Sequence, residues 1–165
     1  MRRPTPVAPG PGQESVWDYT RPPRVEPVAE RVTIRLGGEL IADTRSAVRV
    51  LETSHPPVYY VPIADFVQGA LTDSPGASFC EFKGAARYFD VHGGGTVAAG
   101  AAWNYPDPAP GFETLVDRVA VYAGPMDECT VGDEVVVPQP GGFYGGWVTS
   151  WVVGPFKGIP GSLGW

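Results

Sequence analysis

The sequence predicts a mainly β protein in which short strands alternate with tight turns. Its 165 residues include 22 glycines and 19 prolines, a content that disfavours long helices and favours turns between short strands. Residues 31–36 alternate cleanly, with Val32, Ile34 and Leu36 on one face and polar side chains on the other, as in a half-buried strand. We find no helical periodicity longer than about three turns, which places the fold in the mainly β class.

The first half of the chain predicts a series of strands that follows an N-terminal arm. Residues 1–14 have too little apolar content to pack and are expected to form a disordered arm. Residues 15–165 have a natural length for a single domain. Gly37-Gly38 predicts a hairpin turn, and residues 62–66 predict one helical turn with Pro62 near its start. The strands expected in this half are 31–36, 39–43, 47–53 and 58–61.

The second half predicts further strands and a C-terminal segment of different composition. The strands expected here are 79–82, 85–91, 96–105, 118–122, 128–131 and 134–137. Residues 138–165 are rich in glycine, proline and aromatic side chains, and are too aromatic for a solvated linker. We expect this segment to wrap the outside of the fold and to meet Trp17.

Composition excludes several classes of function. The net charge of −6 and the absence of a dense basic run argue against nucleic-acid binding. Two isolated cysteines and two histidines cannot supply a closed tetrahedral metal site, so we predict neither a metal nor another cofactor. The basic start Met1–Pro4 is followed by no apolar run, and no run is long enough to span a membrane. These features predict a soluble, cytoplasmic protein.

The segment Ser78–Phe89 combines reactive side chains with aromatic rings and is the first candidate for a site. Lys83 is one of only two lysines, and Lys157 repeats its Phe-Lys-Gly setting. Desolvation beside Phe82 would disfavour the charged form of Lys83 and leave a nucleophilic amine or proton acceptor. The alternative is an ion pair with Glu52 or Glu81 that supports the sheet.

Glu52 and His55 flank a rigid turn and are candidates for acid–base chemistry. Glu52 shares a strand face with Val48 and Val50, and an inward carboxylate requires a partner, which Lys83, Arg49 or Arg87 would supply. As a general base it would lie well beside Tyr59 and Tyr88. His55 precedes two prolines and titrates near neutrality, although a turn histidine also serves as a hydrogen-bond anchor.

The remaining candidates combine a packing role with a ligand-binding role. Cys80 is either a buried packing residue or a nucleophile, depending on whether His55 lies near it in space. Trp103 and Tyr105 either fill the core or form an aromatic wall for a flat ligand. We predict catalytic roles for Lys83, Glu52 and His55, and ligand-binding roles for Tyr59, Cys80, Arg87, Tyr88, Trp103 and Tyr105.

Four segments together resemble the domain-of-unknown-function family 427, which carries a nucleotidyltransferase-like label: Glu52–Tyr60, Cys80–Gly84, Ala102–Pro106 and Gly141–Gly158. The resemblance spans roughly residues 15–165, and Glu81-Phe82 stands where the family pattern has Pro-Tyr. It implies a β-tent, in which two antiparallel sheets meet along one ridge, without the paired C-x-x-C zinc knuckle of some relatives. Two-metal phosphoryl transfer uses closely placed carboxylates, and the sequence has no Asp-x-Asp pair. We therefore expect this chain to share the fold of the family but do not predict a nucleotidyltransferase reaction.

Two functions from different classes fit these residues. The first is the binding, with or without chemical conversion, of a small polar metabolite or nucleotide in a pocket between the sheets. The second is a non-catalytic interaction module that uses the aromatic C-terminal segment, for example to form a homodimer. A cavity with converging polar groups would favour the first, and a filled interior beside an exposed aromatic patch would favour the second.

Overall fold

The computed structural model of the protein describes residues 3–165, and strands dominate it. Helical structure in this part of the chain consists of three short 3-10 turns, η1 (Val16–Asp18), η2 (Ile63–Asp65) and η3 (Glu113–Leu115). None of these turns has the length or apolar content that a membrane crossing requires. The predicted mainly β class is confirmed, and η2 lies within the predicted helical turn at residues 62–66.

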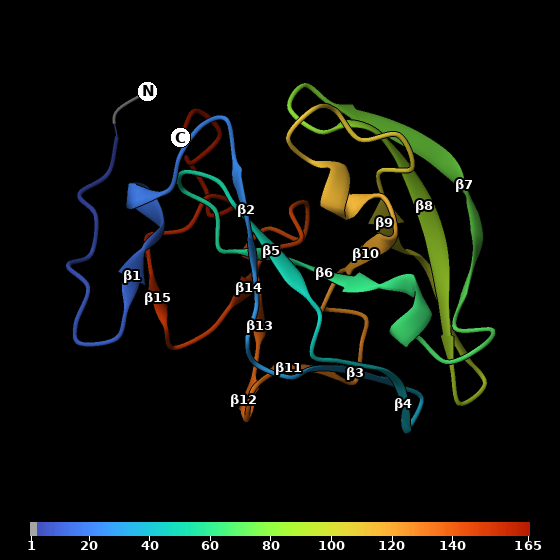
Figure 1. Ribbon diagram of the computed structural model, residues 1–165. Helices are drawn as coiled ribbons and strands as arrows, with labels where there is room; N and C mark the ends of the chain where they lie inside the picture. Colours follow the sequence, from blue (N-terminus) through green and yellow to red (C-terminus); the bar gives the residue numbers. More distant parts are fainter. Residues whose placement is uncertain (1–2) are drawn as a thin grey trace.

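A seven-stranded antiparallel sheet forms the centre of the fold (Figure 1). Its strands, in spatial order, are β2 (Arg24–Pro27), β5 (Val48–Leu51), β6 (Val58–Pro62), β10 (Arg118–Val121), β9 (Thr96–Asn104), β8 (Gly84–Gly93) and β7 (Leu71–Cys80). The long β7–β8 hairpin lies at one end of the molecule, and β1, β15 and the C-terminus lie toward the other end (Figure 1).

A four-stranded antiparallel sheet packs against part of this sheet. Its order is β12 (Glu134–Val135), β11 (Glu128–Val131), β3 (Val32–Leu36) and β4 (Glu39–Thr44). The largest apolar cluster includes Ile34 and Leu36 from this sheet and Val61 from β6. Alternation along β6 directs Tyr59 and Val61 to that cluster and Val58 and Tyr60 to a second cluster. The sheet therefore has two buried faces. The finer designation β-tent stays a prediction.

The C-terminal segment packs along the folded sheets and forms two small sheets. The strand β15 (Val152–Val153) pairs in parallel with β1 (Glu14–Ser15), and β14 (Trp147–Val148) pairs with β13 (Val137–Pro138). The expected contact with Trp17 is present, because its indole N–H donates to the carbonyl of Pro155 at 2.9 Å and its ring meets that of Trp165. These contacts hold the segment that contains β1 and Trp17 against the C-terminal segment.

The predicted disordered arm covers residues 1–14, of which Met1 and Arg2 lie outside the described residues. The amide of Val7 donates to the carbonyl of Gly154 at 2.8 Å. The amide of Glu14 donates to the carbonyl of Trp151, also at 2.8 Å. This arm therefore makes backbone hydrogen bonds to the C-terminal segment, which the sequence pattern did not indicate.

The main difference from the sequence-based expectation is β7, which begins at Leu71 rather than at residue 79. Most of its side chains are exposed, because it is an edge strand whose outer side faces no other strand of the sheet. Alternation of apolar and polar residues is consequently absent, and Pro75 and Gly76 lie in a bulge opposite β8. The strand ends at Cys80, so Glu81, Phe82 and Lys83 form the hairpin turn instead of extending the strand.

The β3–β4 hairpin turn offers a matched test of close backbone packing. Gly37 and Gly38 both have positive φ, of 60° and 80°. A Cβ at Gly37 would lie 2.0 Å from the carbonyl oxygen of Gly93, whereas one at Gly38 would meet nothing within 4 Å. We expect Gly38→Ala to lower the free energy of unfolding by about 1–2 kcal/mol, from φ strain alone, and Gly37→Ala to lower it further. Urea unfolding measures both; equal losses would contradict the close approach.

Candidate functional site

A cavity of about 630 Å³ lies between one face of the seven-stranded sheet and the C-terminal segment. Its floor comes from β5, β6, β8 and β9, and one rim comes from the β7–β8 turn. The segment 139–157 closes the opposite rim with Gln139, Tyr144 and Lys157. Among the described residues, none that lines it belongs to the four-stranded sheet. The predicted site residues that line this cavity therefore do not lie between the two sheets, because the C-terminal segment covers the sheet face that the second sheet leaves free.

Seven of the nine predicted site residues line this cavity: Glu52, His55, Cys80, Lys83, Tyr88, Trp103 and Tyr105. Tyr59 and Arg87 lie elsewhere. Side chains alternate along a strand, so Tyr59 points away from its neighbour Tyr60 and stacks on Trp147 on the opposite face. Arg87 likewise points away from Tyr88; it is exposed, pairs with Asp73 at 3.2 Å and lies over the ring of Phe89.

Lys83 is buried at the rim of the cavity, with 9% of its surface exposed. Its carbonyl accepts a hydrogen bond from the amide of Ala109 at 2.9 Å, which fixes the turn that presents the side chain. The ammonium lies 5.8 Å from the centre of the Tyr105 ring. Within residues 3–165 it forms no ion pair with Glu52, Glu81 or any other carboxylate, so the proposed salt-bridge role is wrong.

Lys157 enters the same cavity from the C-terminal segment. Although the glycine- and proline-rich sequence around it is typical of a hydrated surface segment, Lys157 is half-buried; its ammonium lies 5.5 Å from the centre of the Tyr144 ring and donates to the main-chain oxygen of Trp165 at 3.3 Å. Its amide donates to the carbonyl of Ser54 at 2.8 Å, which ties the segment to the turn that carries His55. The two lysines of the chain therefore belong to one site.

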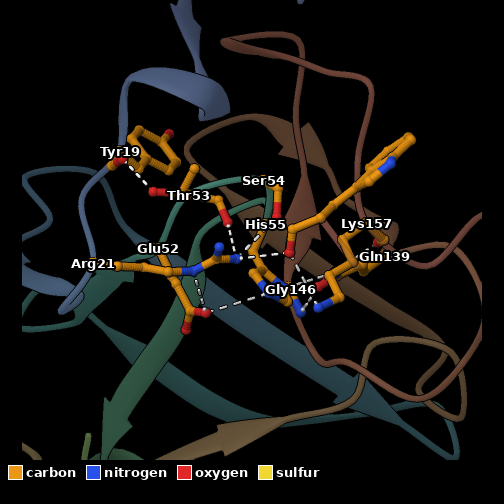
Figure 2. Close-up of polar contacts among 10 residues, drawn as sticks. Tyr19, Arg21, Glu52, Thr53, Ser54, His55, Gln139, Gly146 and Lys157 are labelled. Atoms are coloured by element: carbon orange, nitrogen blue, oxygen red, sulfur yellow. Dashed lines mark hydrogen bonds and ion pairs between the residues drawn. The ribbon is translucent and has the colours of Figure 1, made fainter. Parts of the chain in front are cut away.

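Glu52 is oriented by Arg21, a partner that the sequence did not indicate. The guanidinium Nε lies 3.3 Å from Oε2 of Glu52, and Nη2 donates to the carbonyl of Thr53 at 2.9 Å (Figure 2). Of the partners considered from the sequence, Arg49 binds Glu14 and Glu26 and Arg87 binds Asp73, whereas Lys83 forms no ion pair within residues 3–165. Both members of the Arg21–Glu52 pair are partly exposed, so the pair contributes orientation more than stability.

His55 is held as a neutral imidazole by Gln139 (Figure 2). The amide oxygen of Gln139 accepts from Gly146 N–H at 3.0 Å, and its Nε2 donates to the carbonyl of Lys157 at 2.9 Å, so the amide orientation is fixed. The same Nε2 donates to Nδ1 of His55 at 3.0 Å. Nδ1 must therefore be an acceptor, which leaves the proton on Nε2. That nitrogen lies 3.5 Å from Oε2 of Glu52.

Burial lowers the pKa of His55 from 6.5 to about 4, and the attraction of Glu52 is too weak to offset it. The positive charges of Lys157, Arg21 and Lys83 lower the pKa further. Two roles were considered for His55, acid–base chemistry and a hydrogen-bond anchor. Because Nδ1 already accepts a hydrogen bond and Nε2 carries a proton, neither nitrogen is free to accept a proton, and the structure supports the anchor. A ligand oxygen near Nε2 would receive a hydrogen bond.

Aromatic side chains make up most of the cavity wall. Trp103 lies 4.7 Å from the Tyr122 ring, and Tyr144 lies 4.7 Å from the imidazole of His55, edge to face. The hydroxyl of Tyr122 donates to the carbonyl of Phe143 at 3.1 Å, which joins sheet and C-terminal segment. Burial raises the pKa of Tyr105, so its phenol stays protonated. The wall thus offers flat apolar surface with a small number of donors.

The two cysteines are free and occupy different environments. Cys80 is half-buried and lines the same cavity as His55. The two residues therefore belong to one site, although they are distant in sequence. Cys129 is buried in the main core, where burial raises the pKa of its thiol to about 12. Within the described residues no group of three histidine, cysteine or acidic side chains is placed to hold a metal ion.

Several residues of the site were missed from the sequence. Strand alternation could have predicted Tyr60, because its side chain points to the opposite face from Tyr59 and packs beside Tyr105. Gln139 and Tyr144 come from a segment without periodicity, and only the folded chain brings them to His55. The one local signal for this segment was the repeated Phe-Lys-Gly triplet at Lys157.

A family model described as Domain of unknown function (DUF427) matches residues 24–132, which is more than half of the chain. The chain belongs to the DUF427 family. The match contains three of the four segments that carry the resemblance and ends before the fourth, Gly141–Gly158. The part of this DUF427 protein that closes the cavity therefore lies outside the matched region. No curated protein matches the chain.

The two lysines should differ in their reaction with an amine-modifying reagent. Lys83 is the less exposed of the two, since it is buried and Lys157 is half-buried. At limiting reagent we expect Lys157 to be modified first and Lys83 to be protected, because the reagent must enter the cavity to reach it. Peptide mapping after a short exposure gives the two rates. Equal rates would mean that the β7–β8 turn opens readily in solution.

Proposed function

We propose that this DUF427 protein binds a small polar metabolite or nucleotide in the cavity beside Lys83. The observation that carries the proposal is the convergence of Lys83, Glu52 and His55 on one open cavity of about 630 Å³. Ligand sites commonly have volumes of about 300–1,000 Å³, are lined mainly by apolar side chains and contain few, well-placed polar groups.

The support around these polar groups is typical of a preorganised site. Arg21 orients Glu52, and Gln139 orients His55 through hydrogen bonds whose other partners are backbone groups. Ser54, which precedes His55, is a non-glycine residue with φ of +74° and is fully buried. Backbone strain of this kind costs about 1–3 kcal/mol and is concentrated at sites where geometry matters. This is the pattern expected where a ligand requires fixed donors and acceptors.

The test is to identify a retained compound by mass spectrometry. The purified protein is incubated with a mixture of nucleotides and polar metabolites, separated from free compounds by gel filtration and denatured to release what it holds. Tyr144→Ala removes a half-buried wall of the cavity, and Trp151→Ala removes an exposed ring of the same segment that does not line it. We expect a compound retained by the parent and Trp151→Ala and lost from Tyr144→Ala. Equal retention by all three proteins, or none by any, would contradict the proposal.

The alternative function is an interaction module, and exposed aromatic side chains support it. Phe143 and Trp151 of the C-terminal segment are 75% and 55% exposed. The cavity beside them is open rather than filled, which favours ligand binding over this alternative. Sedimentation analysis distinguishes the two: the module predicts a homodimer that dissociates in Phe143→Ser, whereas the ligand-binding proposal requires no change of mass.

A further inference from the structure

Both lysines of the chain line one cavity, and within the described residues neither pairs with an aspartate or glutamate side chain. Lys83 reaches it from the β7–β8 turn and Lys157 from the C-terminal segment. His55 lines the same cavity as both lysines, and their positive charges help to lower its pKa. Within residues 3–165 the Lys157 ammonium donates to the main-chain oxygen of Trp165 at 3.3 Å, whereas the Lys83 ammonium has neither a hydrogen-bond acceptor nor an ion-pair partner.

The negative groups that line the cavity do not cancel these charges. The carboxylate of Glu52 is already paired with Arg21 at 3.3 Å. Glu81 is exposed on the hairpin turn, where water screens it, and makes no ion pair in the described structure. Lys83 is 9% exposed as a residue and its ammonium has no partner, and an anion placed beside a buried charge offsets the cost of burying it. The cavity of an acidic protein thus presents an unpaired positive charge at Lys83, beside a second ammonium whose acceptor is a main-chain oxygen.

We propose that the ligand carries a compact anionic group, a carboxylate or a phosphate, bound between Lys83 and Lys157, on a flat apolar body that lies against the aromatic wall. This inference rests on the proposed function and names the class of ligand. The Nε2–H of His55 lies 3.5 Å from the Glu52 carboxylate, so the anionic group is placed at the lysines rather than beside His55. The rings of Trp103 and Tyr122 provide the apolar surface for the body.

The main alternative is a cationic ligand, because cavities lined by aromatic rings also bind cations. Here the ring faces of Tyr105 and Tyr144 already lie next to the ammonium groups, at 5.8 and 5.5 Å. A third cation would meet two like charges of limited exposure, and repulsion between like charges in such a site is strong. The charge arrangement therefore selects an anion.

Four compounds that share one phenyl ring test the charge preference: benzoate, phenyl phosphate, benzamide and benzylamine. Their dissociation constants are measured by isothermal titration at low ionic strength, where screening is weak. We expect at least one of the two anions to bind about tenfold or more tightly than benzamide, because benzamide forms no charge-assisted hydrogen bond with an ammonium. Benzylamine should bind more weakly than benzamide. The two anions separate a carboxylate site from a phosphate site.

Variants locate the anion. Lys83→Gln and Lys157→Gln should each weaken binding of the preferred anion about tenfold and leave benzamide unchanged. Lys83→Arg keeps the charge and should retain most of the affinity. Arg87→Gln is the matched control, since Arg87 is a cation on the neighbouring strand that lies outside the cavity. Circular dichroism confirms that each variant is folded, and Lys157→Gln carries the test if Lys83→Gln does not fold.

Two results would overturn the inference. One is benzamide or benzylamine binding as tightly as both anions. The other is an anion affinity that Arg87→Gln lowers as much as the lysine variants do, which would place the anion on the outer surface. In either case a metabolite retained by the parent and lost from Tyr144→Ala would leave the proposed function standing. If none of the four compounds binds and no metabolite is retained, both proposals fail.

Discussion

Replacing Trp147 by alanine is expected to lower the free energy of unfolding by about 3–5 kcal/mol. Trp147 is 1% exposed, stacks on Tyr59 with ring centres 5.2 Å apart and donates its indole N–H to the carbonyl of Val121 at 3.0 Å. The substitution removes this packing, leaves a cavity in the main core and orphans a buried carbonyl. A typical domain has a free energy of unfolding of about 5–15 kcal/mol, so the expected loss is about a fifth of the stability or more.

Trp151→Ala is the matched control, because Trp151 lies in the same segment and is 55% exposed. Trp151→Ala should lower the free energy of unfolding by about 1 kcal/mol or less. Chemical unfolding followed by linear extrapolation gives both values. Equal effects of the two substitutions would mean that the C-terminal segment, which lies beyond the family match, is not part of the stable core.

Stability should decline as the pH falls from about 6.5 toward 4, and much of the decline should come from His55. Its pKa is about 4 in the folded protein against 6.5 ordinarily, because burial disfavours the imidazolium. Above 6.5 the group is neutral in both states, so its contribution is fully present. Between the two values the unfolded chain binds a proton that the folded protein does not, and stability falls as the pH falls. The contribution at stake is on the order of 3 kcal/mol.

His55→Gln removes this titration and should flatten the curve of unfolding free energy against pH within that window. Carboxylates whose pKa is lowered by bonding partners, such as Glu14 and Asp43, lose their contribution at lower pH in both proteins. Urea unfolding at several pH values gives the two curves. Parallel curves for parent and variant would show that His55 is not held neutral.

Local pattern was sufficient to predict much of the sheet structure but not its longest edge strand. The hairpin of β3 and β4 follows from clean alternation and a Gly-Gly turn, and β11 has the predicted bounds, residues 128–131. The strand β7 could not be found in this way, because an edge strand with little buried surface carries no periodic signal. Its existence depends on pairing with β8.

The candidate site was predictable to the extent that its residues lie near one another in sequence or share a strand face. Lys83 and Tyr88 come from one hairpin, and Glu52 and His55 from one turn. Tyr59 was assigned to the wrong face, although alternation relative to Tyr60 contained the information. Arg21, Gln139 and Lys157 reach the site through contacts between distant segments, and no local property of the sequence encodes such contacts.

The most direct measurement of the central claim uses the fact that the chain has only two lysines, both at the cavity. Protein labelled with carbon-13 in its lysine side chains should give one ε-carbon signal for each, and Lys157→Gln assigns them. The anion that binds most tightly in the phenyl series is then added in steps. We predict that both signals shift and saturate with the same dissociation constant, and that benzamide shifts them far less. If the anion binds while either lysine signal stays fixed, the two lysines do not form one ligand site.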